Sequence, residues 1–394
     1  MNLTLPLPRP LPALSQLYFD RWLLGLIATL LTIGLVMIAS SSMSYAEVKF
    51  HDPFFFIRRH IPYLMLGIIG GALAFAVPSA IWQRYYRVWV VVAVLLLLVV
   101  LIPGLGRRFN GSQRWLGMGG FTFQVSEVAK IAAVFFMAAF LDNYRDAMRS
   151  NFKVFLVPVG VMALFAGLLV MEPDFGSTVV LVGTMLTLLF LGGARLDHYL
   201  GVLLAGGSIL ALVASQKEYL VNRYTAYLDP WEHQFDSGYQ LTQSLIAFGR
   251  GEWFGVGLGQ SIQKLLFLPE AHTDFVFAIY AEEFGFVGVL LLIGLFVAFV
   301  GRLLWLARRA IQQHNCFAAY SLLGFALLLA GQSLINLGVN AGLLPTKGLT
   351  LPLISYGGSS LLITLMMLGI ALRMTHDHRL ALPDSAKRSR HDKR

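Results

Sequence analysis

Apolar runs long enough to cross a membrane recur along almost the whole chain of 394 residues. A transmembrane helix needs about 20 apolar residues to cross a hydrocarbon core of ~30 Å. Successive runs of roughly this length meet that requirement with few interruptions. We therefore predict an all-α integral membrane protein with about ten transmembrane helices. The predicted spans are residues 22–44, 61–77, 87–103, 124–141, 153–171, 175–193, 198–215, 277–301, 316–340 and 352–373.

The composition supports a membrane protein, because 57% of the residues are hydrophobic and only 13% are charged. Soluble domains of this length carry about twice that share of charge. The single cysteine, Cys316, excludes an intramolecular disulfide and a cysteine-based metal site. The net charge of +9 is compatible with either nucleic acid or anionic lipid as a partner, so the placement of the charges has to decide.

An even number of spans places both termini on the same side of the membrane. If that side is the cytoplasm, the cytoplasmic segments hold more of the 30 Lys and Arg than the outside loops do. The positive-inside rule therefore predicts a multi-pass protein of the cytoplasmic (inner) membrane with cytoplasmic termini. The basic excess is explained by topology and membrane lipids, and no nucleic-acid partner is expected.

The predicted organisation is one membrane domain between two short tails. Residues 1–21 are expected to form a cytoplasmic N-terminal tail and residues 374–394 a basic cytoplasmic tail, with the ten-span domain at 22–373. Residues 216–276 form a long extracytoplasmic loop between the seventh and eighth spans. Loops of this length in compact proteins usually serve function, so we expect part of the site there.

The end of this loop concentrates ionisable groups at the start of an apolar helix. In the segment 268–275, Asp274 lies at the expected outer membrane boundary. Partial desolvation would raise the pKa of this carboxylate toward the range of a general base. The structural alternative is that Thr273 or Asp274 only caps the eighth span.

Five cations form a second candidate group. Arg107, Arg108 and Arg114 lie in one outside loop and Lys347 lies in another. Lys130 lies inside the fourth span, where a charge costs roughly 2.5 to 3.5 kcal/mol. Lys130 therefore needs a partner or a polar cavity. Glu127, three residues earlier, is the structural alternative for Lys130, and snorkelling to the interface is the alternative for Lys347. Cations on the outer side would suit a lipid that carries pyrophosphate.

Small residues predict close helix contacts and a break. Gly67, Gly70 and Gly71 favour close approach of a neighbouring helix. The cluster at 355–360 interrupts the tenth span near its outer end, which membrane proteins tolerate only beside protein or a polar cavity. The glycine-rich stretch 255–259 follows no strand, so it is predicted to be a turn and not a phosphate loop.

Five separated motifs occur along the chain. They are Gly111-Ser112-Gln113-Arg114-Trp115, Ser126-Glu127-Val128-Ala129-Lys130, Glu172-Pro173-Asp174-Phe175-Gly176-Ser177, the run 268–283, and Leu344-Pro345-Thr346-Lys347-Gly348-Leu349-Thr350-Leu351-Pro352. Over about residues 20–375 the chain thereby resembles the SEDS proteins of bacterial cell-wall assembly. The stretches 236–253 and 261–264 are more similar to division-type members of that family than to elongation-type members.

The resemblance implies a peptidoglycan glycosyltransferase that polymerises lipid II into a glycan chain at the outer face of the membrane, at the division septum. It places the catalytic carboxylate on Asp274. The implied partners are a class B penicillin-binding transpeptidase of the FtsI type and other divisome proteins. The implied substrate-binding residues are Arg114, Lys130, Lys347, Glu127, His272, Thr273 and Ser355.

No residue set with metal-ligand spacing is present, so no metal site and no cofactor are predicted. A divalent cation, Mg²⁺ or Mn²⁺, held at the lipid pyrophosphate remains an open alternative. The chain also departs from the family pattern at Val125, where Pro is usual, and at Gln260, where Asn is common. The competing functions are a lipid II flippase, which would need charges on both sides of its cavity, an elongation-type polymerase, and a non-catalytic scaffold.

Overall fold

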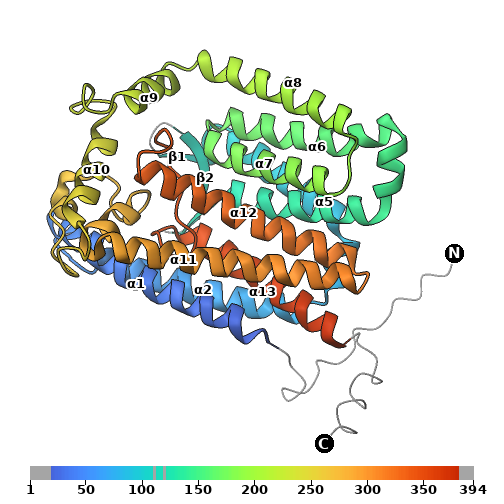
Figure 1. Ribbon diagram of the computed structural model, residues 1–394, viewed down its shortest axis with the longest axis horizontal. Coiled ribbons are helices and arrows are strands. Elements are labelled where there is room, and N and C mark those ends of the chain that lie inside the picture. The colour runs from blue at the N-terminus through green and yellow to red at the C-terminus, as the bar shows by residue number, and fades with distance from the viewer. Residues whose placement is uncertain (1–18, 110–111, 119–120, 381–394) are drawn as a thin grey trace, which may run out of the picture.

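The protein forms a bundle of long helices that run along one axis (Figure 1). The computed structural model describes residues 19–109, 112–118 and 121–380. Together the long helices build the body of the molecule. They are α1 (Arg21–Phe50), α2 (Phe55–Ala76), α4 (Tyr86–Leu101), α5 (Val125–Ser150), α6 (Phe152–Met171), α7 (Phe175–Leu191), α8 (Leu196–Ser215), α11 (Val276–Gln312), α12 (Cys316–Asn340) and α13 (Gly358–Leu380).

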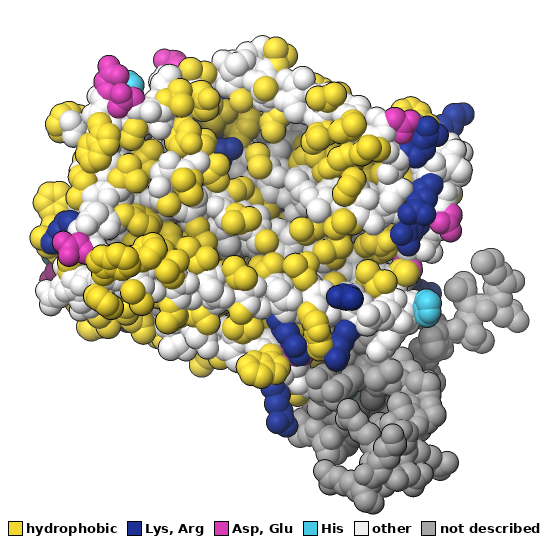
Figure 2. Space-filling view, viewed as in Figure 1, with side chains coloured by type: hydrophobic (Ala, Val, Ile, Leu, Met, Phe, Trp, Pro, Cys, Tyr) yellow, Lys and Arg dark blue, Asp and Glu magenta, His cyan; other side chains and the backbone are white. Residues whose placement is uncertain are grey.

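Seven of the helices in the described part of the chain are long and apolar enough to cross a membrane, and α4 and α7 are shorter apolar helices. Helix α5 carries charged residues but is buried along most of its length, from Val125 to Leu141. Figure 2 shows an apolar surface across the middle of one face. The predicted all-α multi-pass membrane fold is confirmed, whereas the count of ten spans stays a prediction.

Short elements gather mainly at one end of the bundle (Figure 1). Strand β2 pairs antiparallel with β1 on one side and β3 on the other, so Trp115 lies between Arg107 and Gln124. This small sheet was not predicted. The short elements are β1 (Gly106–Phe109), β2 (Ser112–Met118), β3 (Phe121–Gln124), α9 (Glu218–Leu228), α10 (Tyr239–Gly251) and the π-helical turn η2 (Gln263–Phe267), with α3 (Ser79–Arg84) between α2 and α4.

Helices α2 and α13 pack closely, as the small residues of α2 predicted. A Cβ on Gly369 would lie 2.1 Å from the carbonyl oxygen of Gly71, and a Cβ on Gly71 would lie 2.8 Å from the carbonyl oxygen of Leu365. Only glycine fits at such a crossing, because these distances are far below van der Waals contact. Helix α13 is thereby fixed to α2 over its middle turns.

Helix α11 is broken at Gly285, whose φ of 66° and ψ of −168° favour glycine. The loop after α10 satisfies the backbone groups that the break frees. Val256 N–H donates to the carbonyl of Glu282 at 3.0 Å, and Phe286 N–H donates to the carbonyl of Glu252 at 2.8 Å. Because a Cβ on Gly255 would lie 2.2 Å from the carbonyl oxygen of Glu283, the glycines of this stretch serve tight packing.

Several predicted boundaries differ from the structure. Helices α1, α5 and α11 end later than their predicted spans, at residues 50, 150 and 312 instead of 44, 141 and 301, and α2 begins at 55 instead of 61. The tenth long helix begins at Gly358 and not at 352, since residues 352–357 are buried or half-buried chain without helical structure. The same helix continues to Leu380, so the C-terminal tail predicted from 374 starts with helix. Residues 1–18 and 381–394, which make up most of the two predicted tails, lie outside the described residues, as does Gly111 of the first motif.

Candidate functional site

Asp274 lies in the connection between η2 and α11, at the end of the bundle that carries the sheet and the large loop. Its backbone carbonyl accepts hydrogen bonds from the side-chain amides of Asn336 and Asn340 on α12, each at 2.9 Å. The residue that caps α11 is Phe275, and α11 has no side-chain cap hydrogen bond. Asp274 is therefore held by its backbone while its carboxylate stays free of a capping role.

Thr273 does not cap α11 either. Its hydroxyl donates to the carboxylate of Glu270 at 2.7 Å and contacts the backbone carbonyl of Glu270 at 3.2 Å. These bonds close the turn that precedes α11. The capping alternative for Thr273 and Asp274 is thus wrong, because both side chains point elsewhere.

The electrostatic surroundings of Asp274 suit proton transfer near neutral pH. Burial raises the pKa of Asp274 to about 7, and the negative charge of Glu270 adds to the rise, while Arg114 and Arg223 oppose it. The side chain is nonetheless only half-buried at the surface. No hydrogen bond to its carboxylate occurs within the described ranges, so both oxygens are available to a substrate.

The segment that carries Lys347 lies against Asp274. A Cβ on Gly348 would lie 3.0 Å from Oδ2 of Asp274, so the glycine leaves room for the carboxylate. Asn336 also donates to the carbonyl of Leu349 at 2.6 Å, which ties this segment to the same helix that holds Asp274. Hence one amide side chain fixes the positions of both segments.

Lys347 is a half-buried cation without an ion-pair partner in the part of the chain that the structure describes. Burial lowers the pKa of Lys347, and the positive charge of Arg223 lowers it further. Arg223 on α9 donates to the carbonyl of Thr346 at 3.1 Å, which places a second cation beside the first. Two neighbouring cations that form no ion pair among the described residues favour an anionic ligand.

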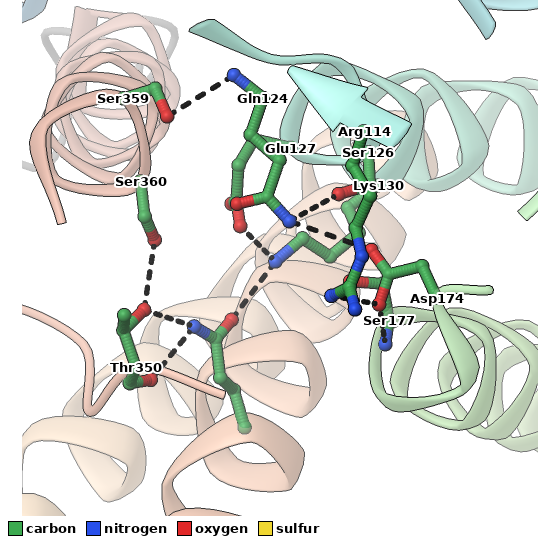
Figure 3. Close-up of polar contacts among 11 residues, drawn as sticks. Arg114, Gln124, Ser126, Glu127, Lys130, Asp174, Ser177, Thr350, Ser359 and Ser360 are labelled. Atoms are coloured by element: carbon green, nitrogen blue, oxygen red, sulfur yellow. Dashed lines mark hydrogen bonds and ion pairs between the residues drawn. The ribbon is translucent and has the colours of Figure 1, made fainter. Parts of the chain in front are cut away.

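Arg114 on β2 is held by a polar network in front of α7 (Figure 3). Its guanidinium donates to Asp174 at 3.3 Å and to the hydroxyl of Ser112 at 2.8 Å. Gln124 reaches the other oxygen of Asp174 at 3.4 Å and donates to Ser126 at 3.0 Å. The unpredicted sheet thus aims Arg114, because β2 and β3 supply both Arg114 and Gln124.

Lys130 is buried inside the bundle and is paired. Its ammonium donates to Glu127 at 2.8 Å and to the side-chain oxygen of Gln332 on α12 at 3.0 Å (Figure 3). Gln332 in turn donates to the carbonyl of Thr350 at 3.0 Å. The structural alternative for Lys130 is therefore observed, with a second partner from α12 that links the pair to the segment after Lys347.

His272 and Ser355 have local partners. The ring of His272 is buried and packs against Phe56 with a centroid distance of 4.2 Å, and burial lowers its pKa to about 4. The ring is therefore neutral at physiological pH. The hydroxyl of Ser355 accepts a hydrogen bond from the backbone N–H of Leu351 at 2.8 Å, which closes the turn before α13. The backbone carbonyl of His272 also accepts a hydrogen bond from the N–H of Tyr356 at 2.9 Å, so the two residues tie the segment before Asp274 to the turn before α13.

Val125, at the first departure from the family pattern, is the first residue of α5. Proline is favoured at this position because its fixed φ suits a helix start, and valine reaches the same conformation. The helix begins there without a kink, and Lys130 follows in its second turn. The departure therefore leaves the polar network intact.

The partners of the Asp274 and Lys347 segments were not predicted. Arg223, Asn336 and Asn340 lie within hydrogen-bonding distance of the segments that carry Lys347 and Asp274. The two asparagines are four residues apart in an apolar helix. Paired amides on one face of a predicted span are a usable signal of a polar interior.

The donor set does not favour a metal held by the protein. Among the described residues there is no group of three or more His, Cys, Asp or Glu that could hold a metal ion. The charges that act on Asp274 have both signs, because Glu270 is negative and Arg114 and Arg223 are positive. The two arginines would repel a cation and suit an anionic ligand.

Comparison with known proteins identifies the family. A family model described as "Cell cycle protein", covering FtsW, RodA and SpoVE, matches residues 21–380. The chain belongs to this family. The SEDS membership predicted from the five motifs is confirmed.

Relatives within the family carry a more specific name. A protein named "Probable peptidoglycan glycosyltransferase FtsW" from Saccharophagus degradans is 47% identical over 374 residues, which cover 95% of this chain and 96% of the relative. A protein of the same name from Legionella pneumophila is also 47% identical over 374 residues, covering 95% and 94%. These names confirm the predicted enzyme class and the division-type branch of the family.

Solved structures show the same fold. A chain in a study described as "Structural coordination of polymerization and crosslinking by a peptidoglycan synthase complex" is similar with a TM-score of 0.76 and 30% identity, over 92% of this chain and 99% of that one. The rod shape determining protein RodA of Thermus thermophilus is similar with a TM-score of 0.69 and 29% identity, again over 92% and 99%.

Proposed function

We propose that the protein polymerises lipid II at the outer face of the cytoplasmic membrane during septal cell-wall synthesis, with Asp274 as general base. The observation that carries the proposal is the half-buried carboxylate of Asp274, which has a raised pKa and lies against the segment of the unpaired cation Lys347. The relatives named as peptidoglycan glycosyltransferases support the same reaction class.

The reaction needs one base and one anion site. The carboxylate of Asp274 takes the proton from the 4-hydroxyl of the acceptor sugar, and that oxygen forms a bond to the anomeric carbon of the donor chain. The bond from this carbon to the phosphate oxygen breaks, and its electron pair leaves with undecaprenyl pyrophosphate. Arg114 and Lys347 stabilise the negative charge that grows on the leaving group. A single displacement of this kind inverts the anomeric centre.

The position of the charges favours a polymerase over a flippase. Arg114, Asp274 and Lys347 all lie toward one end of the bundle, where the sheet and the large loop are found. A transporter with alternating access would also need free anion-binding groups at the opposite opening, whereas Arg145, Arg149 and Arg302 there donate to backbone carbonyls or to Asp20. Deeper in the bundle Lys130 is bonded to Glu127 and Gln332, so it is not a free cation for a ligand that passes through.

The test of the function is polymerisation of labelled lipid II by the purified protein with a class B penicillin-binding transpeptidase, which we propose as its partner. Glycan chains separated by length are the expected product. If lipid II moved across vesicle membranes and no glycan chains formed, the polymerase proposal would be wrong and a flippase would be supported. We also propose that any divalent cation used in the reaction is bound by the pyrophosphate of lipid II.

Replacing Lys347 with alanine is expected to raise the KM for lipid II about 10-fold, because a charged hydrogen bond to pyrophosphate contributes roughly 1.5 to 3 kcal/mol. The decrease in kcat of this variant should be smaller than the change in KM. Lys347→Arg keeps the charge and is the matched control. Steady-state kinetics at limiting lipid II measure both constants, and an unchanged KM in Lys347→Ala would contradict a role in binding.

We further propose that both termini are cytoplasmic. Figure 2 shows that most basic side chains on one face lie toward the end at which α5 and α11 finish. At that end Arg145 and Arg149 donate to the carbonyls of Gly192 and Gly193, and Arg302 pairs with Asp20. A clustering of this kind is typical of a cytoplasmic face.

Single cysteines introduced at Phe235 and at Arg308, in a chain whose Cys316 is replaced by serine, test this orientation. A membrane-impermeant thiol reagent added to intact cells is expected to label the cysteine at 235 and to leave the one at 308 unlabelled. Phe235 is 90% exposed, so access to the reagent does not depend on local unfolding. The reverse labelling pattern would overturn the proposed orientation.

A further inference from the structure

Glu172 is a buried carboxyl group to which the proposed reaction gives no role. It follows the last residue of α6, and two residues separate it from the start of α7. Its side chain is completely buried, and neither carboxyl oxygen has a hydrogen-bond partner within the described parts of the chain. An unpartnered carboxylate at such a site costs several kcal/mol if it stays charged, so the group needs either a proton or an occasional partner.

Glu172 lies beside the ion pair that holds Arg114. Asp174 accepts hydrogen bonds from Arg114 at 3.3 Å and from the backbone N–H of Ser177 at 3.2 Å. The charges of both Asp174 and Arg114 act on Glu172. One nitrogen of Arg114, Nε, is buried and has no partner among the residues described. The guanidinium of Arg114 therefore pairs with one buried carboxylate, acts on a second only through its charge, and keeps one donor unused.

The charge of this group depends on Glu172 alone. With Glu172 ionised, two carboxylates and one guanidinium leave a net charge of −1, which opposes an anionic ligand. With Glu172 protonated, the charges of Arg114 and Asp174 balance and the remaining donors of Arg114 can bind a phosphate. The free carboxylate of Glu172 would also compete with the phosphate for the unused Nε.

We propose that Glu172 is a positioning residue that controls the affinity of Arg114 for the lipid pyrophosphate: when protonated it leaves the guanidinium to the ligand, and when ionised it competes for the guanidinium. The inference rests on the proposed function, because it assumes that Arg114 binds pyrophosphate. It adds a proton-linked control of that binding.

The surroundings of Glu172 place its titration in the useful range. Burial raises the pKa of Glu172 to about 8, the charge of Asp174 adds to the rise, and Arg114 opposes it. The other charged groups near this end of the neighbouring helices are Glu127 and Lys130 on α5, which are bonded to each other. Helix α4, which also packs on α6, contributes no charged residue there. The protonated form therefore predominates below pH 8.

The sign of the pH effect follows from this pKa. As the pH rises through about 8, Glu172 loses its proton and the site loses affinity for pyrophosphate. If only the protonated form binds, the apparent dissociation constant rises about 10-fold between pH 7 and pH 9. Glu172→Gln cannot ionise, so its affinity should stay near the low-pH value across this range. Glu172→Met, which also cannot ionise, should behave in the same way if glutamine disturbs folding.

The experiment has a binding part and a kinetic part. Binding of farnesyl pyrophosphate is measured from pH 6.5 to 9.5 in protein that carries Asp274→Asn, with and without Glu172→Gln. At each pH, the dissociation constant of the protein with Glu172 is divided by that of the protein with Glu172→Gln. This ratio is independent of the titration of the probe itself. The ratio is expected to reach about 10 at pH 9, and a ratio that stays constant with pH would overturn the inference.

Kinetics of lipid II polymerisation supply the second readout. The KM of the native chain should rise above pH 8, and the KM of Glu172→Gln should not. In both chains kcat should fall below about pH 7, because Asp274 is protonated there. Lys347→Arg tests whether Lys347 causes the pH dependence instead. If the pH at which KM rises is shifted in Lys347→Arg, and the rise persists in Glu172→Gln, the effect belongs to Lys347 and the inference is refuted.

The two proposals fail in different ways. If the chain with all its native residues forms no glycan but binds farnesyl pyrophosphate with the pH dependence that Glu172 predicts, the proton-linked site stands and the polymerase function fails. If glycan forms and Glu172→Gln shows the same alkaline loss of affinity as the native chain, the function stands and the role of Glu172 fails.

Discussion

Asp274→Asn is expected to lower the rate of lipid II polymerisation by about 10²- to 10⁴-fold, the range that a positioned general base contributes. Asparagine has nearly the same shape as aspartate, and the bonds that hold residue 274 go to its backbone carbonyl. The substitution therefore removes the proton acceptor while it leaves the connection between η2 and α11 in place. The KM should change little, because the anion is bound by Arg114 and Lys347.

The matched control is Asp236→Asn, which removes an exposed carboxylate from the same large loop. This variant should keep the rate within about twofold, as surface substitutions usually do. Glycan formation at saturating lipid II measures the effect, with elution as a single species in size-exclusion chromatography as the test of folding. A folded Asp274→Asn protein with unaltered turnover would exclude Asp274 as the base.

The same carboxylate predicts a pH dependence of kcat. Burial raises the pKa of Asp274 to about 7, so the fraction of ionised base falls as the pH drops through 7. The rate should decrease about 10-fold for each pH unit below that value.

The membrane fold and the family could be predicted from the sequence because each is indicated by short, contiguous stretches of residues. An apolar run of 20 residues needs no information from the rest of the chain to indicate a helix, and the five motifs are contiguous. Asp274, Arg114 and Lys347 could be proposed from local context too, since Asp274 lies at an expected membrane boundary and the two cations lie in outside loops.

Apolar pattern alone could not set the start of the tenth helix. Leu351, Leu353 and Ile354 are all buried, yet they belong to irregular chain before α13. Hydropathy reports burial and does not distinguish a helix from a packed loop. The sheet was missed for a related reason, because β1 and β3 have only four residues each and carry too few positions for an alternating pattern.

Hydrogen-bond partners that lie far apart along the chain could not be predicted from the sequence either. The pairing of Lys130 with Glu127 followed from their spacing of three residues, whereas Gln332, its second partner, is 202 residues away. Arg223 gave no signal in the large loop, because its role depends on where α9 lies against Thr346. Glu172 was visible as part of a motif, but only the fold shows that its carboxyl group is buried without a partner.

Asn336 is the residue whose replacement should most clearly separate positioning from chemistry. Its amide donates to the carbonyl of Asp274 at 2.9 Å and to the carbonyl of Leu349 at 2.6 Å, so it joins the segment of the base to the segment of Lys347. Asn340 donates only to the first of these segments and to its own helix.

Asn336→Asp is expected to lower kcat about 100-fold, because it replaces two donated hydrogen bonds with repulsion between oxygens, and a displacement of about 1 Å at a reacting group costs a factor of this size. Asn340→Asp should cost less, since Asn336 still holds both segments. Asn143→Asp, an exposed amide on α5, is the matched control. Turnover and KM for lipid II are measured for all three. If Asn336 positions both segments, Asn336→Asp should lower kcat and also raise KM, because the segments of Asp274 and Lys347 both move. An equal decrease of kcat in Asn336→Asp and Asn340→Asp would show that Asn336 does not join the two segments.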